Sequence, residues 1–143
     1  MTMRAFSRSL PMALMRARES VMAEFRPILA AHEVTEQQWR VLRALVDAPD
    51  GLGVGELAER AVLMGPSVSR ILVALEGRGL IRRSPVDHDG RRAVVTATPA
   101  GLDLYELISP ASEAVYRRVE ERFGAADLDR LHALLERLTT ALD

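Results

Sequence analysis

The sequence predicts a mainly α-helical fold (α+β) in which one short β-hairpin interrupts a series of helices. Apolar residues recur at helical spacing over most of the 143 residues, and two short β-prone runs lie on either side of "DHDG". Apolar residues make up 48% of the chain and aromatic residues only 4%, so the core must be built from Leu, Val, Ala and Met. A chain of this length can bury one such core as a single domain.

The first half of the chain is predicted to form three helices. The first should run from about Pro11 to Ala31, with Pro11 in its first turn and Pro27 as an internal kink. Thr35 should begin the second helix, because "TEQQ" has the spacing of a capping box. "PDG" ends that helix, "LGV" is long enough only for a strand fragment, and Glu56–Ala61 forms a short third helix.

A fourth helix follows "GPS", and Gly77 and Gly79 end it. The runs "LIRRSPV" and "RRAVVTAT" then predict a hairpin with a polar tip. Thr98 should cap a fifth helix that has Pro99 at its first position, a bend at Pro110 and its end at "GAAD". The last helix has leucines at a strict 3-4-3-4 spacing. The fourth helix should bury one apolar stripe, formed by Val68, Ile71, Leu72 and Leu75.

The third and fourth helices, with the hairpin after them, have the layout of a winged helix-turn-helix. In such a unit the second helix enters the DNA major groove with its N-terminal end first. Free backbone N–H groups and the positive end of the helix dipole then face phosphate. Ser67, Ser69 and Arg70 lie at that end, where hydroxyls and a guanidinium can reach phosphates or base edges. For the helix taken alone, a solvated helix with a serine-rich first turn is the alternative.

The hairpin favours DNA binding over that alternative. Arg91 and Arg92 stand beside the turn, where a wing can place a guanidinium in the minor groove, and Asp89 could orient Arg91. A surface ion pair worth about 0–1 kcal/mol is the alternative for Asp89 and Arg91. The net charge of −1 hides a basic segment, residues 66–97 with net charge +3, and an acidic one, residues 98–143 with net charge −4. We expect contacts to double-stranded operator DNA from Pro66, Ser67, Ser69, Arg70, Arg78, Asp89, Arg91 and Arg92.

The segment "ELAERAVLMGPSVSRILVALEGRGLIRR", followed by "DHDGRR" and "TPAG", resembles the MarR family of bacterial transcription regulators. That family has an Asp-x-Arg wing tip, matched by Asp89-Gly90-Arg91, and a Leu-Thr-x-x-Gly helix start, matched by Thr98-Pro99-Ala100-Gly101 with Ala97 in place of Leu. Many members have an Arg just before the wing-tip Asp, where this chain has His88. "FSRSLPMALMRARE" and "VTEQQWRVLRAL" resemble the homoprotocatechuate-degradation operon regulators, a subgroup that represses genes for 4-hydroxyphenylacetate breakdown.

The resemblance implies an obligate homodimer in which the N- and C-terminal helices interlock. The final leucine stripe could equally pack within one subunit, but a two-fold DNA-binding protein with half-sites about one helical turn apart favours pairing of the terminal helices. We therefore expect one MarR-like domain over residues 1–143. Its dimerisation helices should lie at 1–34 and 99–143, and its winged helix-turn-helix DNA-binding lobe at 35–98.

Effectors of this family bind between the dimer helices and the DNA lobe, which implies a site near the first helix. Arg16 follows Met12 there and could anchor the carboxylate of a small aromatic acid, with Trp39 as an aromatic wall. Arg16 could instead be a snorkelling arginine or a member of an ion pair, and Trp39 could simply pack in the core. The expected effector-binding residues are Arg16, Trp39 and Met12.

Other functional classes find little support in the sequence. The chain has no cysteine, its three histidines are scattered, and it has no nucleophile, phosphate-loop or dinucleotide motif, so neither an enzyme nor a metal or other cofactor is expected. No signal peptide or membrane span is evident, which predicts a cytoplasmic protein. We expect a repressor of an aromatic-acid catabolic operon that a phenolic or aromatic acid releases from DNA. The alternatives are a regulator of another aromatic pathway or of drug efflux, or a ligand-binding dimer without DNA function.

Overall fold

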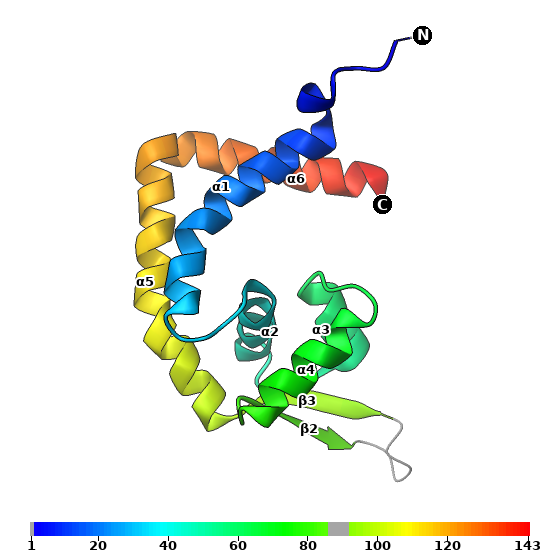
Figure 1. Cartoon of the computed structure of the whole chain (residues 1–143), viewed down its shortest axis with the longest axis vertical. Helices are drawn as coiled ribbons and strands as arrows, with labels where there is room; N and C mark the ends of the chain where they lie inside the picture. Colours follow the sequence, from blue (N-terminus) through cyan, green and yellow to red (C-terminus); the bar gives the residue numbers. More distant parts are fainter. Residues whose placement is uncertain (1, 86–91) are drawn as a thin grey trace. The chain divides into compact units, whose positions relative to one another are not determined.

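The computed structural model describes residues 2–85 and 92–143 (Figure 1). The chain divides into two compact units, one of Met1–Phe25 with Pro110–Asp143 and the other of Arg26–Ser109. The division falls inside two long helices, α1 (Leu10–Ala30) and α5 (Pro99–Phe123), so each of these helices contributes to both units. Both helices continue through an internal proline, Pro27 in α1 and Pro110 in α5.

The unit Arg26–Ser109 has the predicted order of a helix-turn-helix followed by a hairpin. The sheet is antiparallel with strand order β1-β3-β2, and Val95 of the central strand lies opposite Leu52 on one side and Arg83 on the other. Between the two halves of the hairpin lie residues 86–91, which are outside the described residues. The elements are α2 (Glu36–Val46), β1 (Leu52–Gly53), α3 (Val54–Arg60), α4 (Ser67–Gly77), β2 (Ile81–Pro85) and β3 (Ala93–Ala97).

An aliphatic core holds these elements together. Leu42 of α2, Leu57 of α3, Leu72 of α4 and Val95 of β3 are fully buried in one cluster, as helical and strand spacing requires of residues that face a common interior. The predicted stripe of α4 is confirmed, because all four of its apolar side chains are buried. Helix α3 begins two residues earlier than the sequence predicted, and its first residue, Val54, packs against the same core.

Two threonine caps fix where helices begin. Thr35 forms the predicted capping box, in which its hydroxyl accepts from the N–H of Gln38 and the Gln38 side chain accepts from the N–H of Thr35, both at 3.1 Å. Thr98 accepts from the N–H of Gly101 at 3.1 Å and donates to the carbonyl oxygen of Gly79 at 2.5 Å. The cap of α5 is therefore also bonded to the turn that follows α4.

The glycine of "TPAG" has a steric cause. A methyl group on Gly101 would lie 2.2 Å from the carbonyl oxygen of Leu80, a backbone atom that cannot move aside cheaply. Only glycine lets α5 begin this close to the chain that leaves α4.

The other unit consists of α6 (Ala125–Leu142) with the N-terminal part of α1 and the C-terminal part of α5. A short 3-10 turn, η1 (Phe6–Arg8), precedes α1. The rings of Phe25 and Tyr116 lie 5.0 Å apart, and Arg118 pairs with Glu24 at 3.5 Å, so α1 and α5 contact each other here. Gly124, with φ of 102°, separates α5 from α6 at the predicted "GAAD" break. No residue of α6 is fully buried: Leu128 and Leu138 of its leucine stripe are half-buried, and Leu131, Leu135 and Leu142 are exposed.

The compact units do not follow the divisions drawn from the sequence at residues 34/35 and 98/99. Residues 26–34 and 99–109 belong to the same unit as the winged helix. The reason is packing: Leu29 and Ile108 are buried in the core of that unit, although both lie on helices predicted to serve dimerisation. Dimerisation by the terminal helices itself stays a prediction.

Gly101→Ala should lower the free energy of unfolding by about 1–3 kcal/mol, because the new methyl group overlaps a backbone oxygen. Gly55→Ala is the matched control, since nothing lies within 4 Å of a methyl group at that helical position. It should raise stability by about 0.5–1 kcal/mol. Urea unfolding at fixed protein concentration measures both variants. Equal effects of the two substitutions would contradict the steric account.

Candidate nucleic-acid interface

The N-terminal turn of α4 is exposed and carries no side-chain cap. Pro66 is the N-cap residue and makes no side-chain cap hydrogen bond, and no acidic residue lies in the first turn. Burial of the apolar stripe turns Ser67, Ser69 and Arg70 outward, and all three are exposed. An exposed helix start of this kind offers free N–H groups and a positive dipole end to an anion. The structure thus brings four of the predicted DNA contacts together in one turn.

The turn before α4 places this end of the helix. Val62 has φ of 53° and Gly65 has φ of 56°, both in the left-handed region. Between them Leu63 is buried, and its N–H donates to the carbonyl oxygen of Ala58 at 2.8 Å. Arg40 of α2 also donates to the carbonyl oxygen of Val62 at 3.3 Å. Burial of Leu63 and these hydrogen bonds hold Val62 in a conformation that a β-branched residue otherwise avoids.

Arg78, another predicted DNA contact, lies at the opposite end of α4 from the serines. It is the C-cap residue, and its guanidinium donates to the carbonyl oxygens of Glu33 at 2.7 Å and His32 at 3.2 Å. The structure therefore separates Arg78 from the cluster at Pro66–Arg70 and bonds it to the turn between α1 and α2. A direct contact from Arg78 to DNA stays a prediction.

The tip of the wing lies outside the described residues. Asp89, Arg91 and His88 all fall in residues 86–91, so their predicted roles stay predictions. Arg92 is described and exposed just before β3. Arg82 of β2 is exposed too, and sequence reasoning did not select it. The net positive charge of residues 66–97 could have identified Arg82 as a candidate DNA contact.

Val73 is a second residue that sequence reasoning missed. Its side chain is 60% exposed on α4, one turn after Ser69 and Arg70. An apolar side chain on this face suits contact with the methyl group of thymine. The sequence could have identified Val73 by its position, since it is the one valine of α4 that falls outside the buried stripe.

The predicted effector residues are divided between the two compact units. Arg16 and Met12 belong to one unit, where Arg16 is exposed and donates to the carbonyl oxygen of Ser7. Trp39 belongs to the other, where it is 6% exposed and stacks on Tyr105 with ring centroids 5.5 Å apart. Core packing therefore accounts for Trp39 without a ligand, while binding of an effector by these residues stays a prediction.

Known proteins resemble the chain in sequence and in structure. The family model described as MarR family matches residues 32–92. The homoprotocatechuate degradative operon repressor of Escherichia coli is 39% identical over 128 residues, which cover 90% of this chain and 86% of that protein. The chain belongs to the MarR family of transcription regulators. This confirms the family and the winged helix-turn-helix fold that the sequence predicted, and its relatives are regulators rather than enzymes.

Two solved structures extend the similarity over nearly the whole chain. The transcriptional regulator PA4135 superimposes with a TM-score of 0.85 at 39% identity, covering 92% of this chain and 96% of that one. NadR in complex with 4-hydroxyphenylacetate superimposes with a TM-score of 0.79 at 36% identity, covering 96% and 97%. Within residues 2–85 and 92–143, no helix is long and apolar enough to cross a membrane.

Val62→Gly should raise the free energy of unfolding by about 1 kcal/mol, because glycine adopts a positive φ without the cost that a β-branched residue incurs. Thermal and urea unfolding check this. Val73→Gly is the control, since Val73 lies inside a helix, where glycine should destabilise by about 0.5–1 kcal/mol. Loss of stability in Val62→Gly would show that the left-handed turn is not strained.

Proposed function

We propose that this MarR-family regulator is a dimeric repressor of an aromatic-acid catabolic operon, such as one for homoprotocatechuate or 4-hydroxyphenylacetate, and that a phenolic or aromatic acid releases it from operator DNA. The observation that carries the DNA-binding part is the exposed, uncapped start of α4 with Ser67, Ser69 and Arg70. The 39% identity to a homoprotocatechuate operon repressor supports the choice of operon.

The reading of DNA by α4 follows from its chemistry. Ser67 and Ser69 are short side chains, so the helix can approach a groove closely while their hydroxyls bond phosphate or base edges. Arg70, with its longer reach, can donate two hydrogen bonds to a guanine. The buried stripe on the opposite face fixes which side chains of α4 are presented.

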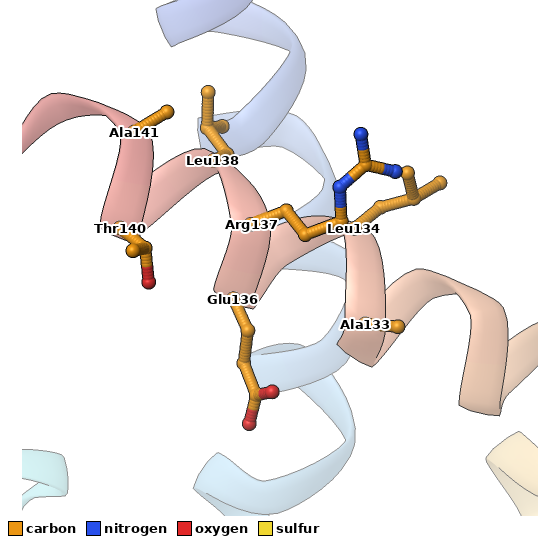
Figure 2. Close-up of a pocket in the computed structure, with 7 residues that line it drawn as sticks. All are labelled: Ala133, Leu134, Glu136, Arg137, Leu138, Thr140 and Ala141. Carbon is orange, nitrogen blue, oxygen red and sulfur yellow. The ribbon is translucent and has the colours of Figure 1, made fainter.

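Dimerisation is supported by the exposed apolar side chains of the unit that contains α6. Leu134 is 56% exposed and projects from the same side of α6 as Leu138, while Glu136 projects from the opposite side (Figure 2). Leu14 of α1 and Phe123 of α5, in the same unit, are exposed as well. Exposed large apolar side chains on three helices of one unit favour a surface that another molecule covers, and a second copy of the chain would give the two-fold arrangement that a paired half-site requires.

The effector part is supported by the structural similarity to NadR, whose complex contains 4-hydroxyphenylacetate. A carboxylate leaving water needs a cation to offset its desolvation, and arginine can supply two parallel hydrogen bonds. Arg16 fits this role, because the hydrogen bond described for its guanidinium is to a neutral carbonyl, that of Ser7, which a charged carboxylate can displace. Release from DNA then requires that the ligand bind more tightly to the form that does not bind DNA.

Arg70→Ala should weaken binding to DNA from the protein's own promoter by about 1–3 kcal/mol, as expected for removal of a hydrogen bond to a base or phosphate. Fluorescence titration with labelled duplex measures this. Arg60→Ala is the control, since Arg60 is an exposed arginine of α3 that pairs with Glu56 at 2.9 Å. It should bind almost normally. Equal affinity of Arg70→Ala and the wild type would count against α4 as the reading helix, and no promoter binding by either would leave a ligand-binding dimer as the function.

Arg16→Ala should keep promoter binding but lose release by 4-hydroxyphenylacetate, because the carboxylate loses its cation. Calorimetry with 4-hydroxyphenylacetate measures the affinity directly. Arg18→Ala is the control on the same helix, where Arg18 lies 4.0 Å from Glu19. If Arg16→Ala binds the acid as tightly as the wild type does, Arg16 is not the anchor. If the wild type does not bind the acid, the effector belongs to another class.

A further inference from the structure

We propose that Arg78 is a positioning residue that fixes the C-terminal end of α4 to the turn after α1 and so sets the direction in which α4 presents its reading face. The proposal rests on the DNA-binding role proposed for α4. It differs from the sequence-based prediction, in which Arg78 itself contacts DNA.

The guanidinium joins two parts of the chain that are 45 residues apart in sequence. Nη1 of Arg78 donates to the carbonyl oxygen of Glu33 at 2.7 Å, and Nη2 donates to that of His32 at 3.2 Å. The backbone of Arg78 is equally fixed, because its N–H donates to the carbonyl oxygen of Ala74 and closes the last turn of α4 at 3.2 Å. Movement of this side chain is therefore coupled to movement of the helix end.

The turn that accepts these hydrogen bonds is itself well defined. Glu33 has φ of 56°, and its N–H donates to the carbonyl oxygen of Ala30 at 3.0 Å. The N–H of Val34 donates to the carbonyl oxygen of Leu29 at 2.9 Å, and both Leu29 and Val34 are buried. The carbonyls of His32 and Glu33 follow the negative end of the α1 dipole, where a cation is favoured. Arg78 thus binds a rigid acceptor rather than a loose loop.

The buried side chains of α4 form one stripe against the core. Its C-terminal end is also held by the Thr98 hydroxyl, which donates to the carbonyl oxygen of Gly79, and by Glu76, which pairs with Arg83 of β2 at 3.6 Å. Arg78 adds an attachment of the same end to a different element, the turn after α1. Arg78 is eleven residues from Ser67, about 16 Å along the helix, so a small tilt at the C-terminal end displaces the reading residues by a comparable distance.

The test compares Arg78→Ala and Arg78→Lys with the wild type on promoter DNA and on unrelated duplex DNA. Positioning predicts that both variants lose about tenfold in promoter affinity, or roughly 1.4 kcal/mol, and keep their affinity for unrelated DNA. Lysine should fail like alanine, because a single ammonium group lacks the planar fork that spans two carbonyls. The slope of log K against log salt should not change, since the protein still neutralises the same number of phosphates.

Direct binding of phosphate by Arg78 predicts a different pattern. Arg78→Ala would then lower the salt slope by about one for each phosphate that Arg78 neutralises, weaken binding to both DNAs alike, and be largely rescued by lysine. That pattern overturns the proposal. Arg60→Ala, which removes the same charge from an exposed ion pair on α3, should change neither the promoter preference nor the fold.

Hydrogen exchange tests the attachment without DNA. The amides of Glu33 and Val34 should exchange faster in both Arg78 variants than in the wild type. In the control Arg60→Ala, the same two amides should exchange at the wild-type rate. Unchanged exchange at these amides, or faster exchange with full promoter affinity, overturns the proposal. If the wild type does not prefer promoter DNA, the proposed function fails, and the role of Arg78 in DNA reading falls with it.

Discussion

The fold of the DNA-binding unit depends on burial of one apolar stripe of α4 against the core. Ile71, Leu72 and Leu75 pack with Leu42 of α2 and Val95 of β3. Because a helix has one inner face, this burial decides that Ser67, Ser69, Arg70 and Val73 face outward. The same side chains that stabilise the unit therefore select the residues available to a nucleic acid.

Side-chain hydrogen bonds supplement the hydrophobic core around α4. The Thr98 hydroxyl accepts from the N–H of Gly101 at the start of α5 and donates to the carbonyl oxygen of Gly79 after α4. Gly101 allows these two segments to approach each other closely. Arg78 bonds the other side of the same region to the turn after α1. Each of these bonds lies near the C-terminal end of α4, whereas its N-terminal turn is left without a side-chain cap. Polar side-chain bonds thus gather at the end of α4 away from Ser67, Ser69 and Arg70, and these three residues stay exposed.

Features that depend on neighbours in sequence were predictable. The capping box at Thr35, the cap at Thr98 and the stripe of α4 all follow from spacing within one helical turn or two. The positive φ of Val62 was not predictable, because valine gives no local signal for it and burial of Leu63 imposes it. The hydrogen-bond partners of Arg78 could not be predicted for a similar reason, since the carbonyl groups that it binds belong to residues 45 and 46 positions earlier in the chain. The wing residues Asp89 and Arg91 rest on the sequence alone.

On the proposed function, two copies of this chain read one duplex through paired α4 helices. The most direct measurement combines sedimentation of the protein–promoter complex with hydroxyl-radical footprinting. We expect two chains per duplex and two protected patches on one face of the DNA, separated by about one helical turn of 10–10.5 base pairs. A complex with one chain per duplex, or protection without this spacing, would contradict it.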